Sequence, residues 1–291
     1  MPLDEYRLAN RDNWDARVDL HCESVEYGVG RFISDPAHLS GVVTYDRVKV
    51  GDVSGKRLLH LQCHIGTDTI SWARLGAEVT GTDLSPKSIA AARRLSEESG
   101  TPARFEVAEL YDTAAVIDEK FDIVYTGVGA ICWLPDIVGW AGLVAAFLET
   151  GGIFYMREGH PMMWALDWED TRELRVTLPY FETGEPDGEE EDETYAGEGK
   201  VASPLNYGWN HGIGETINAL IQAGIRIDSV EEYDECEWQG QAQMVLEQDG
   251  RWRLPRAASG SRRCGLCSAP KPDDVLTNHF RPPCLLPRTS G

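Results

Sequence analysis

An alternation of short apolar runs with helical stretches between Lys56 and Glu158 constrains the fold more than any other feature. This order is typical of a parallel sheet covered by helices on both faces. The candidate strands are rich in Val, Ile, Leu, Phe or Tyr and lie at residues 57–63, 78–82, 104–108, 121–126 and 153–158. The predicted fold class is therefore α/β, with a mostly parallel sheet flanked by helices.

Start and stop signals place helices between these strands. Ser85 can cap a helix whose first turn holds Pro86, and Gly100 can end it. The other predicted elements are two helices, a strand and a polar loop, at 137–148, 213–223, 225–230 and 182–200 respectively. The loop contains the acidic run 189–193.

Composition narrows the class of protein. With 291 residues, 42% of them hydrophobic, the chain can build a sizeable core. A net charge of -21 would repel a phosphate backbone, so nucleic acid is not an expected partner. No segment approaches the roughly 18 apolar residues that span a bilayer, and no leader peptide is evident, so we expect a cytoplasmic protein without a membrane partner. The seven cysteines form no secreted disulfide framework.

A turn follows the first predicted strand, where an open parallel sheet binds its ligand. It reads Leu61-Gln62-Cys63-His64-Ile65-Gly66. This stretch resembles motif I of the class I S-adenosylmethionine-dependent methyltransferases, in a variant form. The family carries an acid where His60 stands and glycines where Gln62 and His64 stand. The resemblance covers residues 10–255 and implies a Rossmann-like sheet that binds S-adenosylmethionine.

The resemblance also implies which residues hold this cofactor. Gln62, Cys63, His64 and Gly66 would surround its methionine portion. The other predicted contacts lie at the ends of later strands and are Asp83, Leu84, Glu109, Leu110 and Gly127. Asp83 would accept hydrogen bonds from the ribose hydroxyls, and Glu109 with Leu110 would lie beside the adenine. The alternative for Asp83 is that it only helps to cap the helix at Ser85.

Residues that could carry the chemistry follow the fourth and fifth strands. Glu158 and His160 bring an acid and an imidazole to one edge of the sheet, and His160 is the first candidate for a general base. His211 is the alternative, and His21 or Asp46 could enter from the N-terminal segment. Trp133 is a candidate for an apolar or cation-π wall, the alternative being a plain core residue. Cys132 has no evident basic partner and is not expected to act as a nucleophile.

The predicted organisation has three parts. Residues 1–50 form a helical or irregular segment over the site, 51–255 the methyltransferase domain with a roof insertion at about 160–211, and 256–291 a disordered tail. The tail offers no apolar run for the family's closing antiparallel strand, as a shifted reading frame would explain. The alternative to a disordered tail is a weak zinc site, formed by Cys264, Cys267, His279 and Cys284. No metal is predicted in the domain.

The sequence therefore predicts transfer of a methyl group from S-adenosylmethionine to a small-molecule acceptor by in-line displacement. The main alternative is a protein that binds S-adenosylmethionine or another nucleoside without catalysis. A nicotinamide oxidoreductase ranks lower, because the turn lacks the spaced glycines that a pyrophosphate requires. The acidic run could attract an amine or be a solvated loop, and both a monomer and a homodimer remain open.

Overall fold

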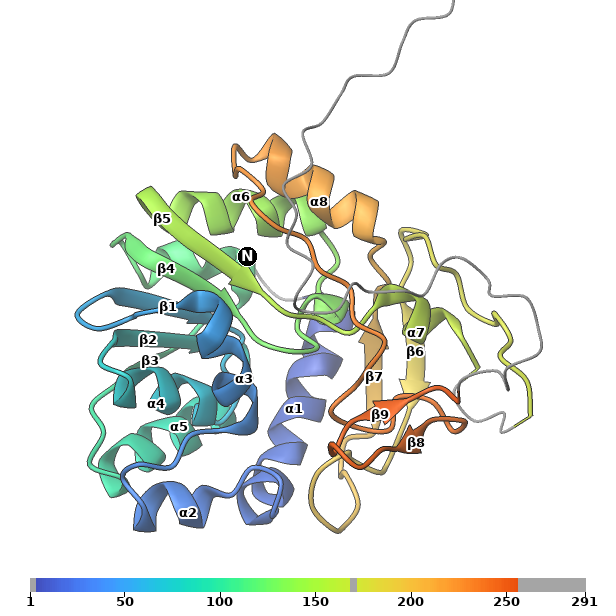
Figure 1. Ribbon diagram of the computed structural model, residues 1–291, viewed down its shortest axis with the longest axis horizontal. Helices are drawn as coiled ribbons and strands as arrows, with labels where there is room; N and C mark the ends of the chain where they lie inside the picture. The colour runs from blue at the N-terminus through green and yellow to red at the C-terminus, as the bar shows by residue number, and fades with distance from the viewer. Residues whose placement is uncertain (1–3, 168–171, 256–291) are drawn as a thin grey trace, which may run out of the picture. The chain divides into compact units, whose positions relative to one another are not determined.

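The computed structural model describes residues 4–167 and 172–255, which belong to two units, Met1–Val230 and Glu231–Gly291. Figure 1 shows the arrangement of the described elements. The predictions of a disordered tail and of a zinc site fall on residues 256–291 and lie outside the described residues. The two units are described separately below.

A five-stranded sheet forms the centre of the first unit. Its strands are β1 (Arg57–Leu61), β2 (Glu78–Asp83), β3 (Arg104–Val107), β4 (Phe121–Thr126) and β5 (Leu148–Met156). They follow the order β3-β2-β1-β4-β5, and every pairing is parallel. The order reverses beside β1, so the carboxyl ends of β1 and β4 flank the switch point where such sheets bind ligands. The predicted α/β fold with a Rossmann-like parallel sheet is confirmed.

Helices cover both faces of this sheet (Figure 1). One face carries α3 (Gly41–Val50), α4 (Thr67–Arg74) and α5 (Pro86–Glu98), and the other α6 (Ile137–Phe147), α8 (Ile213–Gln222) and the short helix η1 (Leu110–Ala115). Neighbouring β1 residues point to opposite faces: Leu58 packs with Trp72, and Leu59 with Trp140. The predicted cap is also present, because Ser85 Oγ accepts a hydrogen bond from Ser88 N at the start of α5.

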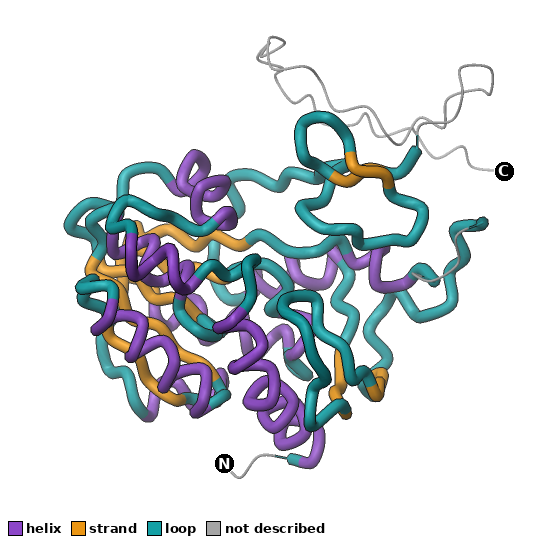
Figure 2. Tube along the Cα trace, turned by 90° about the horizontal axis from the view of Figure 1, so that it is seen from below, coloured by secondary structure: helices purple, strands orange, loops and turns teal. Residues whose placement is uncertain are grey.

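Further helices and a hairpin lie outside the sheet. Helices α1 (Glu5–Glu23) and α2 (Val29–Ser34) precede the sheet, and α7 (Pro161–Ala165) and the short helix η2 (Ile131–Trp133) follow β5 and β4 respectively. Strands β6 (Asp187–Glu190) and β7 (Leu205–Gly208) form an antiparallel pair. Helix α1 packs against both α5 and β7, as Figures 1 and 2 show. The N-terminal segment and the hairpin β6–β7 are thus joined beside the sheet.

Three expectations from the sequence need correction. Residues 225–230 form no strand, because Ile225 and Ile227 pack on the α6 face without a ladder partner among the described residues. β5 begins at Leu148 instead of residue 153, since a register shift opposite Phe121 accommodates the glycine pair 151–152 inside the strand. Part of the predicted polar loop, Asp187–Glu190, is β6, held by its pairing with β7.

The second unit contributes a small antiparallel pair, β8 (Val245–Leu246) and β9 (Trp252–Arg253). Acidic side chains surround Arg253, which pairs with Glu235, Glu247 and Asp249. Across residues 4–167 and 172–255, no helix has both the length and the apolar character needed to cross a bilayer. Within the same ranges, no group of three or more His, Cys, Asp or Glu side chains is placed to hold a metal ion.

Candidate active site

The turn after β1 holds two non-glycine residues in the left-handed backbone conformation. Gln62 and His64 have φ values of 57° and 48°, and Gly66 has 80°. Each left-handed L-residue costs on the order of 1 kcal/mol. The chain therefore keeps a glycine-type turn while placing two large polar side chains on it, and backbone strain of this kind is typical of binding sites.

The Gln62 side chain joins this turn to the loop after β4. Its Nε2 donates a hydrogen bond to Ala130 O at 2.9 Å. Its Oε1 is buried and has no hydrogen-bond partner in the described part of the chain. A buried acceptor without a donor costs about 1–3 kcal/mol. A ligand that brings an N–H or O–H donor to this turn would remove that cost.

Asp83 lies at the end of β2 and braces the same turn. One carboxylate oxygen accepts from His64 N at 2.8 Å, and the other accepts from Ser85 N at 2.8 Å. Desolvation raises the pKa of the carboxyl to about 6, although the two backbone hydrogen bonds act in the opposite direction. Each oxygen keeps a second lone pair, so the contacts with Ser85 and His64 leave room for ribose hydroxyls as further donors.

The remaining side chains of the turn region are packed in the protein. Cys63 belongs to the core between β1, α4 and α5, and burial raises the pKa of its thiol well above the usual range. Burial likewise raises the pKa of Cys132, as expected for a thiol that is not a nucleophile. Leu84 is half-buried directly after β2. Both thiols are therefore protonated near neutral pH.

Glu109 and Leu110 follow β3, and both have partners within the chain. Glu109 caps η1 by accepting from Tyr111 N at 2.9 Å, and its other oxygen pairs with Arg7 of α1 at 3.2 Å. Leu110 is 6% exposed and packs in the core with α6. Their predicted adenine contact stays a prediction, and Arg7 is a neighbour that sequence spacing could not indicate.

The loop after β4 supplies small residues and an aromatic wall. Gly127 is buried, and a Cβ placed there would lie 3.4 Å from His60 Nε2. Trp133 donates from Nε1 to Gly129 O at 3.0 Å and contacts the ring of Trp14 edge to face, with centroids 5.2 Å apart. Trp133 therefore packs against Trp14 of α1, and its role as an apolar wall stays a prediction.

Glu158, after β5, holds this loop from the opposite side. Its carboxylate accepts backbone hydrogen bonds from Gly129, Ala130 and Ile131 at 2.9, 2.8 and 3.2 Å. Desolvation raises the pKa to about 7 despite these bonds. The contacts indicate that Glu158 positions the loop, whereas its predicted catalytic role stays untested.

Replacing Glu158 with Gln is expected to change how stability depends on pH. The folded carboxyl titrates at about 7 and the free group at 4.5, so its stabilisation is present below pH 4.5 and is lost as the pH rises to 7. The loss in unfolding free energy caused by Glu158→Gln should be larger at pH 5 than at pH 8, by on the order of 2 kcal/mol. Urea unfolding at both pH values measures this, and an equal loss at both would contradict it.

The two predicted histidine bases also have partners. His160 caps α7, with Nδ1 accepting from Met162 N at 3.1 Å. His211 is 5% exposed, its Nε2 lies 2.7 Å from Leu134 O, and its Nδ1 lies 3.8 Å from Glu215 Oε2. His160 is half-buried directly after the sheet, whereas His211 is enclosed. The geometry therefore favours His160 over His211 as a group that can reach a ligand.

A hydrogen-bonded histidine pair connects the turn to α1. His64 Nε2 lies 2.8 Å from His21 Nδ1; His64 Nδ1 lies 2.9 Å from Ser88 Oγ, and His21 Nε2 lies 2.6 Å from Thr194 Oγ1. Burial lowers the pKa of His21 to about 4 and that of His64 well below its usual range, so both rings are neutral. Sequence reasoning named each histidine separately but missed the contact, since it joins segments far apart along the chain.

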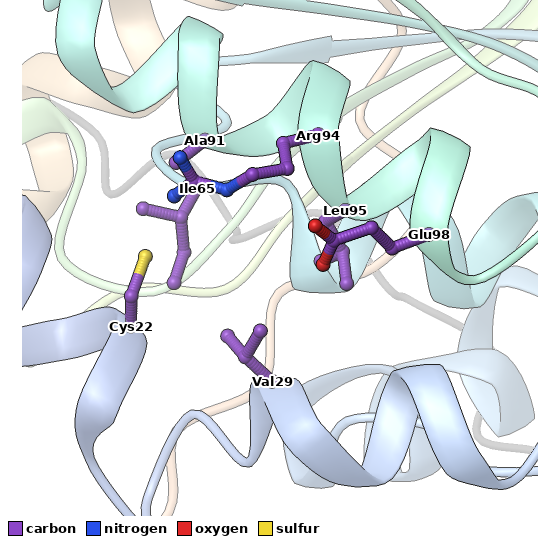
Figure 3. A pocket seen from close by; sticks show the side chains of 7 residues that line it. All are labelled: Cys22, Val29, Ile65, Ala91, Arg94, Leu95 and Glu98. Carbon is purple, nitrogen blue, oxygen red and sulfur yellow. The ribbon is translucent and has the colours of Figure 1, made fainter.

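Figure 3 shows a cavity behind the turn rather than at the predicted site. It is lined by residues of α1, α2, α5 and the turn, namely Cys22, Val29, Ile65, Ala91, Arg94, Leu95 and Glu98. Its volume is about 30 Å³. A space of this size holds about one or two water molecules and is too small for a nucleoside.

Known proteins share sequence similarity with the part of the chain that forms the sheet. Residues 59–154 match the family model described as a methyltransferase domain. The ubiquinone biosynthesis O-methyltransferase of Xanthomonas euvesicatoria pv. vesicatoria is 33% identical over 122 residues, which are 42% of this chain and 51% of that protein. The enzyme of the same name from Bordetella pertussis is 34% identical over 102 residues, 35% of this chain and 42% of that one. The chain thus spans about half the length of the curated relatives it matches.

A solved structure supports the fold. An S-adenosylmethionine-dependent methyltransferase from Mesorhizobium loti superimposes with a TM-score of 0.50 at 24% identity, covering 66% of this chain and 83% of that one. Residues 59–154 therefore match the model of a methyltransferase domain, and the sheet has the Rossmann-like fold of S-adenosylmethionine-dependent methyltransferases.

Proposed function

We propose that this protein transfers a methyl group from S-adenosylmethionine to a small-molecule acceptor. The observation that carries the proposal is the turn after β1, whose strained backbone holds the unpartnered acceptor Gln62 Oε1 and is braced at His64 N by Asp83. An ammonium or hydroxyl donor of the cofactor suits Gln62, and paired ribose hydroxyls suit Asp83. Both groups lie at the ligand-binding edge of the sheet.

The chain's own residues would hold and orient the cofactor. Gln62, His64 and Gly66 would surround its methionine portion, Asp83 its ribose, and Gly127 would permit close approach beneath the reacting centre. When bound, the cofactor supplies an electrophilic methyl on a sulfonium. The acceptor's lone pair would form the new bond to the methyl carbon as the carbon–sulfur bond breaks, releasing S-adenosylhomocysteine.

Alignment and exclusion of water would provide most of the acceleration in such a displacement. Trp14 and Trp133 form an apolar wall beside the turn. A general base is needed only when the acceptor holds a proton. His160 is the first candidate, with Glu158 and His211 as the other two, and Glu158 is more suited to positioning the loop 129–131.

Isothermal titration with S-adenosylhomocysteine tests the cofactor assignment. We expect micromolar binding at one site per chain. Transfer of label from methyl-labelled S-adenosylmethionine to a metabolite extract then tests catalysis. Binding without transfer to any metabolite would favour a non-catalytic nucleoside-binding protein. No binding, with clear binding of a nicotinamide dinucleotide instead, would overturn the assignment.

Replacing Asp83 with Ala is expected to weaken binding of S-adenosylhomocysteine by about 1.5–3 kcal/mol, the usual contribution of hydrogen bonds to a charged acceptor. Because Asp83 also braces His64 N and Ser85 N, some loss of stability should accompany it. Titration calorimetry and urea unfolding separate the two effects. The control is Asp118→Ala, which removes an exposed carboxylate within the same domain. If the variant loses stability but keeps its affinity for S-adenosylhomocysteine, Asp83 has a structural role and does not bind the ribose.

The organisation predicted from sequence belongs to the same proposal. The segment 1–50 and an insertion at about 160–211 would cover the site of the domain 51–255, and hydrogen bonds between α1 and β7 support this division. The proposal also includes a cytoplasmic location and either a monomer or a homodimer. Size-exclusion chromatography with light scattering distinguishes the monomer from the homodimer.

A further inference from the structure

Helix α1 buries a polar face beside the proposed cofactor site. Asn10, Asn13, Arg17 and His21 recur at helical spacing and are 2%, 0%, 4% and 0% exposed. A surface helix normally turns apolar side chains inward. The asparagines have an evident task, since they hydrogen-bond backbone atoms of residues 203–207. Arg17 differs from them because it brings a full charge into the interior.

Arg17 has an incomplete set of partners for a buried guanidinium. Nε donates to the neutral amide oxygen of Asn13 at 2.8 Å, and Nη1 lies 3.4 Å from Thr194 Oγ1. The carboxylate that faces it, on Glu191, is 3.7 Å away and its side chain is 44% exposed. A buried charge is tolerated when a partner offsets its desolvation, and a guanidinium matches a carboxylate through two parallel hydrogen bonds. The contact with Glu191 is longer than such bonds.

The surroundings of Arg17 are aromatic and adjoin the turn after β1. Its Cζ lies 5.6 Å from the ring of Trp14. Trp14 in turn contacts His64 and Trp133, with centroid separations of 4.9 and 5.2 Å. Burial is the main cause of the low pKa of His21, and the charge of Arg17 adds to it, as expected for neighbours. Arg17 therefore lies on the aromatic cluster that borders both the cofactor turn and the loop after β4.

We propose that Arg17 binds the carboxylate of an anionic methyl acceptor, and that Glu191 competes for the same guanidinium when no acceptor is bound. This inference rests on the proposed methyl transfer and names its substrate class, a small acid with an apolar, ring-bearing body that suits the aromatic cluster. Two of the five acids in the acidic run, Asp192 and Glu193, are offset by Lys200 at 2.8 and 3.5 Å, so only part of the run is left to attract an amine. The net charge of -21 repels an anionic acceptor, so such an acid requires an enclosed positive charge to bind it.

Three probes with one ring system test the charge preference. The protein, saturated with S-adenosylhomocysteine, is titrated at pH 7 with 3,4-dihydroxybenzoate, catechol and dopamine, which carry an anionic, a neutral and a cationic substituent. We expect the acid to bind at least tenfold more tightly than catechol, and dopamine to bind no more tightly than catechol. Equal binding of the acid and catechol would overturn the proposal. Preferential binding of dopamine would overturn it in favour of an amine acceptor.

Paired variants then assign the preference to residues. Arg17→Gln should abolish the difference between the acid and catechol, whereas Glu191→Gln should tighten binding of the acid severalfold by removing its competitor. Glu193→Gln makes the same charge change at a side chain that is 77% exposed and should leave the preference unchanged. If Arg17→Gln does not fold, Glu191→Gln decides, since unchanged or weaker binding of the acid by that variant contradicts the proposal.

The cofactor is titrated separately for each variant, so failure of the two proposals can be told apart. A wild-type protein that does not bind S-adenosylhomocysteine overturns the methyltransferase function and this inference with it. A wild-type protein that binds it but shows no preference for the acid overturns the role of Arg17 alone. An acid preference that survives Arg17→Gln in a folded, cofactor-binding variant has the same consequence.

Discussion

Replacing Asp46 with Ala is expected to lower the free energy of unfolding by about 3–5 kcal/mol, the cost typical of removing one partner from a buried ion pair. Asp46 is fully buried on α3. Its carboxylate accepts from Tyr125 Oη at 2.6 Å, from Tyr155 Oη at 3.1 Å and from Arg157 Nε at 2.5 Å. The variant would leave a guanidinium that is only 16% exposed without this carboxylate.

Urea unfolding followed by circular dichroism measures this loss. Asp46→Asn keeps the volume and one acceptor oxygen, so we expect a smaller loss than for Asp46→Ala. Asp19→Ala removes an exposed carboxylate from α1 and should stay within about 0.5 kcal/mol of the wild type. A loss below about 1 kcal/mol for Asp46→Ala would show that the cluster contributes little. The sequence allowed Asp46 as a base, but its three donors indicate that it anchors α3 to β4 and β5.

Replacing Gly66 with Ala is expected to destabilise the protein by about 2–5 kcal/mol and to weaken binding of S-adenosylhomocysteine at least tenfold. A Cβ at Gly66 would lie 2.8 Å from Ala92 Cβ and 2.9 Å from Phe105 Cε1. Its φ of 80° adds strain of about 1–2 kcal/mol, and overpacking adds about 1–3 kcal/mol. Relief requires the turn to move away from α5, which would displace the neighbouring residues proposed to contact the cofactor.

Gly142→Ala provides the matched control for this change. Gly142 is an exposed position in α6, and no atom would lie within 4 Å of a Cβ placed there. Alanine there should stabilise the protein by about 0.5–1 kcal/mol through helix propensity. Thermal unfolding and titration with S-adenosylhomocysteine report both properties for each variant. Wild-type affinity in Gly66→Ala would mean that the turn does not contact the cofactor.

The central sheet could be predicted because its strands are continuous apolar runs between clear helix signals. The helix start at Ser85 and Pro86 is an example in which local chemistry suffices. β6 could not be predicted, since its exposed acidic residues carry no strand pattern and depend on pairing with β7. The opposite error occurred at 225–230, where a suitable apolar pattern finds no partner strand among the described residues.

The site shows the same division between local and long-range information. Asp83 and the turn 62–66 were expected at the ends of β2 and β1, and they lie there because chain order alone places them. The bonds of Glu158 to the amides of 129–131 depend on how two loops meet, which spacing does not encode. The burial of Arg17 depends on contacts with residues 191 and 194, and its position in α1 resembles that of any solvated arginine.

Helix α1 is attached to β7 and the residues before it largely through main-chain atoms. Asn10 and Asn13 bond main-chain atoms of residues 203, 204 and 207, and these atoms are present whatever side chains those positions carry. The contacts that Asn10 and Asn13 make with β7 and the residues before it therefore do not depend on the side chains of those positions, whereas the contacts of His21 and Arg17 with Thr194 do. Under the proposed function, substitutions at residues 203, 204 and 207 could alter the acceptor site while these main-chain bonds to α1 persist.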